Sequence, residues 1–119
     1  MKFIYYNANP FNNQISDCFV RSLSKVTGRT WDEVYEEVSD LARKEGLLFS
    51  NVQFVEDYLD ERYPRECHYS KTVKEFVEEH PKGKYLITME GHITAVINGI
   101  IFDTFNPSNR IMRCAWRVI

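Results

Sequence analysis

The sequence predicts an α+β fold, in which N-terminal helices pack on a C-terminal antiparallel sheet of about four strands. Before position 80, apolar residues recur at a spacing near 3.6, which is typical of amphipathic helices. From Lys84 onward, short segments rich in β-branched and aromatic residues alternate with turn residues, which is typical of strands. The 119 residues, 44% apolar and 27% charged, suffice for one core and one domain over residues 1–119.

The first predicted helix carries a cysteine in its first turn. Ser16 or Asp17 can cap this helix, and Gly28 ends it. Cys18 then lies at the helix start. The apolar stripe consists of Phe19, Val20, Leu23 and Val26.

Three more helices follow from capping signals. Thr30 with Glu33 and Thr72 with Glu75 have the spacing of a capping box, which marks the start of the second and the fourth helix. Ser50 is the expected cap of the third helix, which ends before Pro64. The expected apolar stripes are Trp31, Val34, Val38, Leu41 and Ala42, then Val52, Val55, Tyr58 and Leu59, and finally Val73, Phe76 and Val77.

The predicted strands are residues 84–89, 92–97, 100–105 and 110–118, and the sequence fixes the register of the middle pair. Asn98-Gly99 is typical of a two-residue type I′ hairpin, because both residues tolerate positive φ. Ile97 then faces Ile100, and Thr94 faces Asp103. A period of two places His92 on the same side, diagonal to Asp103 at roughly 7–8 Å between backbones, within reach of a side-chain contact.

These positions suggest a site for acyl transfer. The amides and positive dipole end of a helix N-terminus stabilise a thiolate, which favours Cys18 as a nucleophile over a buried apolar filler. His92 can act as its base, and Asp103 can orient His92. Asp103 has large apolar neighbours in the sequence, so its carboxylate needs a partner, because burying an unpaired charge is costly. The Gln14 amide, with the Cys18 N–H, can hold an oxyanion.

The segments DCFVRSLS at residues 17–24 and GHITAVINGIIFDT at residues 91–104 resemble the papain-like cysteine peptidase superfamily, in particular small members from bacteria and phages. The resemblance implies a papain-like fold with Cys18 as nucleophile, His92 as general base and acid, Asp103 as the orienting residue and Gln14 as oxyanion donor.

Two departures from papain leave alternatives open. Gln14 precedes the cysteine by four residues instead of six, so Asn12, Asn13 or a backbone amide remain candidates for the oxyanion role. Papain uses asparagine to orient its histidine, which makes Asn106 a rival to Asp103, although the hairpin parity favours Asp103.

The expected function is that of a cysteine peptidase or isopeptidase that cleaves an amide bond of a protein or peptide. A transamidase would use the same groups with an amine in place of water. A binding module on a papain-like scaffold, such as a phage-encoded inhibitor, is the alternative from another class. Substrate identity and oligomeric state are not predicted.

Several classes are not supported by the sequence. No cofactor is expected, because phosphate-loop and serine-hydrolase motifs are missing, and Cys67, His68, His80 and Cys114 do not have the spacing of a zinc site. The net charge of −2 argues against nucleic acid, and no long apolar segment suggests a membrane. An odd number of widely spaced cysteines argues against disulfides and favours a reducing, cytoplasmic setting.

Overall fold

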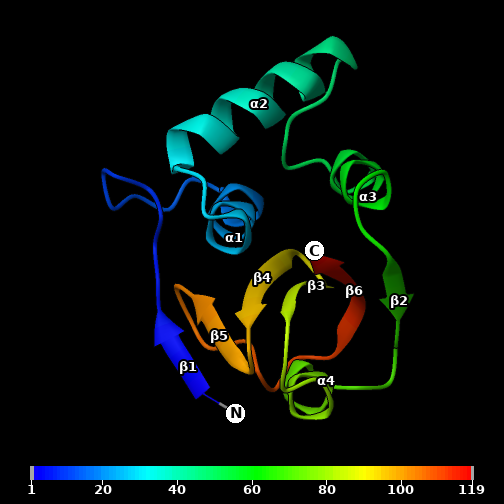
Figure 1. Ribbon diagram of the computed structural model, residues 1–119. Helices are drawn as coiled ribbons and strands as arrows, with labels where there is room; N and C mark the ends of the chain where they lie inside the picture. The colour runs from blue at the N-terminus through cyan, green and yellow to red at the C-terminus, as the bar shows by residue number, and fades with distance from the viewer. Residues whose placement is uncertain (1, 119) are drawn as a thin grey trace.

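The computed structural model describes residues 2–118 and has the expected α+β architecture (Figure 1). The described residues form four helices and one mixed sheet of six strands, in the order β1-β5-β4-β3-β6-β2. The helices are α1 (Cys18–Thr27), α2 (Trp31–Lys44), α3 (Val52–Asp60) and α4 (Val73–Glu79). The strands are β1 (Lys2–Tyr5), β2 (Arg65–Cys67), β3 (Lys84–Met89), β4 (His92–Ile97), β5 (Ile100–Asp103) and β6 (Met112–Val118).

The sheet separates two apolar cores. Helices α1, α2 and α3 lie over one face, and α4 covers the other (Figure 1). Trp116 is fully buried in the first core, and its indole N–H donates a hydrogen bond of 2.8 Å to Asp60 on α3. The alternation of side chains along β3 and β4 supplies residues to both cores, which is why apolar residues dominate these central strands.

The helix boundaries follow the local signals closely. Both predicted capping boxes form, at Thr30 with Glu33 and at Thr72 with Glu75. Gly28 ends α1 in the left-handed conformation, with φ of 71°. The predicted cap of α3 was wrong: the side chain of Asn51, not of Ser50, accepts the hydrogen bond from Phe54 N–H.

One residue of the predicted α3 stripe does not lie in the core. Val52 is 63% exposed, whereas Phe54 is buried in its place. Val52 is the first residue of the helix, and its side chain lines the cleft described below.

The Asn98-Gly99 hairpin forms as predicted. Asn98 and Gly99 have φ of 48° and 77°, and Ile97 pairs with Ile100. The neighbouring pairs Val96–Ile101 and Ala95–Phe102 continue the same register. This register brings the start of β4 and the end of β5 together.

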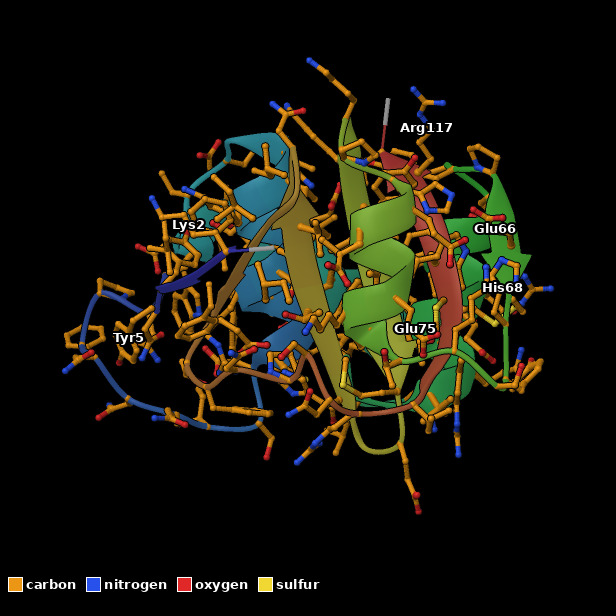
Figure 2. All side chains as sticks on the ribbon, turned by 90° about the horizontal axis from the view of Figure 1, so that it is seen from below. Lys2, Tyr5, Glu66, His68, Glu75 and Arg117 are labelled. Atoms are coloured by element: carbon orange, nitrogen blue, oxygen red, sulfur yellow. A yellow bond between two sulfur atoms is a disulfide. The ribbon has the colours of Figure 1, made fainter. Side chains whose placement is uncertain are left out.

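Two strands were not predicted, so the sheet has six strands instead of about four. Strand β1 pairs with β5 in parallel at one edge, and β2 pairs with β6 at the other. Side chains of both edges project outward, including Lys2 and Tyr5 on β1, Glu66 on β2 and His68 directly after β2 (Figure 2). Edge strands that are this short and this exposed lack the apolar alternation that marks a strand.

The expectation that the chain has no disulfide was wrong. Cys67 on β2 and Cys114 on β6 lie directly opposite each other and form a disulfide. Their separation of 47 residues gives no local signal, and only the pairing of the two strands brings the sulfurs together. The argument for a reducing compartment rested on unpaired cysteines and therefore loses its support. No helix within residues 2–118 has both the length and the hydropathy needed to cross a membrane.

Candidate active site

A cleft of about 450 Å³ opens where the start of α1 meets α3 and one end of the sheet. Cys18, His92 and Gln14 all contribute to its wall. Its apolar part is formed by Phe19, Val52, Val55, Met89, Ile93 and Phe105, and its charged lining residues are Arg21, Glu56 and Arg113. Three of the four predicted site residues therefore line one cavity, and Asp103 lies behind His92.

Cys18 occupies the first position of α1, which is held against β4. The Ser22 hydroxyl, one turn further along α1, donates a hydrogen bond of 3.2 Å to the carbonyl of Ile93. The imidazole of His92 and the backbone of Ile93 both lower the pKa of the Cys18 thiol. Cys18 is half-buried, and its thiol is the one left free of a disulfide among the described residues.

The carboxylate of Asp17 is fully buried directly before Cys18 and forms an ion pair with Arg21. It also accepts a 2.9 Å hydrogen bond from the Trp31 indole. Within the described chain, the Asp17 side chain caps no N–H group of α1. The first helical bond runs from Arg21 N–H to the Asp17 carbonyl, so the amide of Cys18 has no partner within the helix. This N–H group can therefore donate a hydrogen bond to an oxyanion.

His92 and Asp103 are joined as the hairpin register predicted. His92 Nε2 lies 2.7 Å from Asp103 Oδ2, and both side chains are buried. The same carboxylate accepts hydrogen bonds from the Thr94 hydroxyl at 2.6 Å and from Thr104 N–H at 2.7 Å. Because Nε2 is engaged by Asp103, Nδ1 is the imidazole nitrogen left to serve Cys18.

The electrostatics of this arrangement favour a thiolate–imidazolium pair. Burial alone would raise the pKa of Cys18, but the hydrogen bond and charge of His92, the backbone of Ile93 and the charge of Arg21 together lower it below its usual value. Burial lowers the pKa of His92, yet Asp103 and Cys18 overcome this effect and raise it to about 9. Each partner thus favours the charged form of the other at neutral pH.

The residues that the sequence left as alternatives lie in different places in the structure. Gln14 is exposed and lines the cleft, whereas Asn12 and Asn13 are not among the described residues that line it. The Asn106 side chain accepts a hydrogen bond from Ser108 N–H, and the partner of His92 is Asp103.

Sequence reasoning assigned no role to three residues of this region. Phe105 packs against His92 with ring centroids 4.6 Å apart, and it shields one side of the imidazole. Hairpin parity places Phe105 opposite His92, so the signal was present. The i,i+4 spacing of Asp17 and Arg21 allowed for their ion pair, but not for a place of Arg21 in the cleft lining. Arg113 carried no such signal, because its position depends on the pairing of β6 with β3.

Comparison with protein-family models, curated proteins and solved structures finds no match. The fold and the site define an α+β domain in which a thiol and an imidazole line one cleft and a carboxylate lies behind the imidazole. What such an arrangement can do follows from the chemistry of these groups.

Proposed function

We propose that this chain is a thiol-dependent acyl-transfer enzyme of the papain-like type, which cleaves an amide or isopeptide bond of a protein or peptide. One observation carries the proposal: Cys18 and His92 line the same cleft, His92 is hydrogen-bonded to Asp103, and the pKa values of Cys18 and His92 are shifted toward their charged forms. A thiol used only for packing needs neither a basic partner nor an open face.

In the proposed reaction, the Cys18 thiolate attacks the carbonyl carbon of the scissile amide. The Cys18 N–H stabilises the oxyanion that forms, assisted by the Gln14 amide from the rim of the cleft. The imidazolium of His92 then donates its proton to the leaving amine, and a thioester remains on Cys18. His92 next takes a proton from water, and the hydroxide resolves the thioester to a carboxylic acid and the free thiol.

Asp103 and Phe105 support this chemistry without contacting the substrate carbonyl. The Asp103 carboxylate holds Nε2 of His92, which fixes the ring orientation and favours the imidazolium. Phe105 reduces the access of water to that hydrogen bond. An amine that enters in place of water would turn the same steps into transamidation, so the acceptor decides between the two reactions.

The pH dependence of Cys18 alkylation by iodoacetamide tests the proposal. Wild-type Cys18 should react well below pH 8, because its pKa is lowered, and His92→Ala should lose this reactivity. His80→Ala is the matched control, because His80 lies beside Glu66 and outside the cleft lining. A Cys18 that reacts in the same way in wild type and His92→Ala would contradict the proposal and favour a binding module. Peptide and ubiquitin-like electrophiles, compared between wild type and Cys18→Ala, would then identify the substrate class.

A further inference from the structure

Strand β6 contains a β-bulge beside the cleft. Its register with β3 shifts between the pairs Ile87–Ala115 and Met89–Met112, so that one residue of β3 opposes two of β6. The β3 residue is Thr88, and the two β6 residues are Arg113 and Cys114.

The bulge is held from both sides. The Thr88 hydroxyl donates to the Cys114 carbonyl and accepts from the Cys114 N–H, each at 3.2 Å. On its other side, the Cys114 sulfur is bonded to Cys67 on β2. The backbone at Arg113 is thus fixed by a side-chain clamp and by a covalent bond.

The bulge decides where Arg113 points. In a regular strand, Met112 and Cys114 would lie on the same face of the sheet, and Arg113 would point into the core under α4. Instead, Met112 belongs to the core under α4, Cys114 belongs to the opposite core, and Arg113 lines the cleft. The extra residue therefore directs a guanidinium to the cavity that holds Cys18.

The Arg113 guanidinium is available to a ligand. Arg113 is exposed, and no carboxylate within residues 2–118 lies at ion-pairing distance from it. Its charge in the cleft adds to that of the His92 imidazolium, whereas Arg21 is neutralised by Asp17. Among residues 2–118, Glu56 is the one carboxylate in the lining, and it does not form an ion pair with Arg113.

We propose that Arg113 is a specificity-determining residue, which selects substrates that carry a carboxylate near the scissile amide, such as peptides with an acidic side chain beside that bond. A guanidinium can bind such a carboxylate through two parallel hydrogen bonds. It binds the corresponding amide more weakly, because the amide carries no charge and accepts at only one oxygen. The proposal rests on the proposed role of Cys18 as the nucleophile.

The test compares two alkylating reagents that differ in charge and hardly in size. Rates of Cys18 modification by iodoacetate and by iodoacetamide are measured at pH 7 and low ionic strength, and their ratio is the readout. Arg113→Gln should lower the iodoacetate-to-iodoacetamide ratio about threefold to tenfold, the effect of removing one charge from a partly solvated site. Arg113→Lys should retain a large part of the wild-type ratio.

Arg117→Gln is the matched control, because it removes the same charge from the same strand. Arg117 is exposed and projects outward at the far end of β6, away from the cleft (Figure 2). Its ratio should stay at the wild-type value. Peptidyl electrophiles with Glu or Gln beside the reactive group should show the same dependence on Arg113.

The outcomes separate this proposal from the one it rests on. If Cys18 reacts readily with iodoacetamide and Arg113→Gln leaves the ratio unchanged, or Arg117→Gln lowers it equally, the role of Arg113 is refuted while the enzyme proposal stands. If Cys18 of the wild type fails to react with iodoacetamide below pH 8, the proposed function itself is refuted, and the role of Arg113 falls with it.

Discussion

Replacing Asp103 by asparagine should remove most of the support for the charged form of His92. The change keeps the shape of the side chain but removes the negative charge that lies 2.7 Å from Nε2. The Asp103 carboxylate accepts hydrogen bonds from His92, Thr94 and Thr104. An asparagine cannot accept all three, because its amide NH₂ is a donor and would face the N–H of Thr104 in one orientation or the Thr94 hydroxyl in the other. Burial lowers the pKa of His92, and without the Asp103 charge this effect would be offset less.

The magnitude follows from the pKa of His92, which the surroundings raise from 6.5 to about 9. A change of this size corresponds to roughly 3 kcal/mol. Cys18 provides part of it and solvent screens another part, so we assign about half, roughly 1.5 kcal/mol, to Asp103. Asp103→Asn should therefore slow acyl transfer at pH 7 by about tenfold.

Two measurements check this expectation. The rate of Cys18 alkylation should begin to rise at a higher pH in Asp103→Asn than in wild type, because a neutral imidazole no longer favours the thiolate. The ring resonances of His92, followed by NMR across pH, should report a pKa well below 9. In wild type, the ion pair should be lost as pH rises through about 9, when His92 deprotonates, and as pH falls through the lowered pKa of Cys18.

Asp57→Asn on the exposed face of α3 is the matched control, because it makes the same substitution outside the cleft lining. Its alkylation profile should coincide with that of wild type. If Asp103→Asn folds normally and alkylates with the wild-type pH profile, the coupling between Asp103, His92 and Cys18 does not operate, and the reasoning fails.

Three stability predictions concern the framework of the site, each measured by urea unfolding. Replacing Cys67 and Cys114 together by alanine should lower the free energy of unfolding by about 2–4 kcal/mol, because the disulfide closes a long loop; a loss under ~0.5 kcal/mol would argue against the bond. Gly99→Ala should cost about 1 kcal/mol at its φ of 77°, and Gly99→Asn less, since asparagine tolerates positive φ; equal costs would contradict this origin. Asp17→Asn should cost roughly 3 kcal/mol by leaving Arg21 buried without its partner, and adding Arg21→Met should restore part of the loss. If the second change adds to the loss instead, the ion pair is not the cause.

Much of the fold was readable from local sequence rules. The capping boxes at Thr30 and Thr72 are complete within four residues, so their helices could be placed without tertiary information. The Asn98-Gly99 turn likewise fixes the strand register, and that register alone brings His92 to Asp103. Where a few adjacent residues determine the geometry, the sequence was sufficient.

The remaining features depend on segments that are distant along the chain. The edge strand β2 and the disulfide both require β6 as a partner. No sequence pattern in residues 65–67 or around Cys114 predicts this pairing. Arg113 is the clearest example. The alternation of side chains along a strand, which located His92, would place Arg113 in the core under α4 instead of in the cleft lining. A bulge breaks the alternation, and residue types alone do not indicate where a bulge will form.

The parallel pairing of β1 with β5 has a consequence for biosynthesis. Strand β1 is synthesised well before its partner in residues 100–103, and Tyr6 N–H donates a hydrogen bond of 2.8 Å to the carbonyl of Asp103. Strand β1 therefore stays unpaired until residues 100–103 have been translated. His92 and Asp103 emerge equally late, so a nascent chain already exposes Cys18 while the groups that would activate its sulfur have yet to be made.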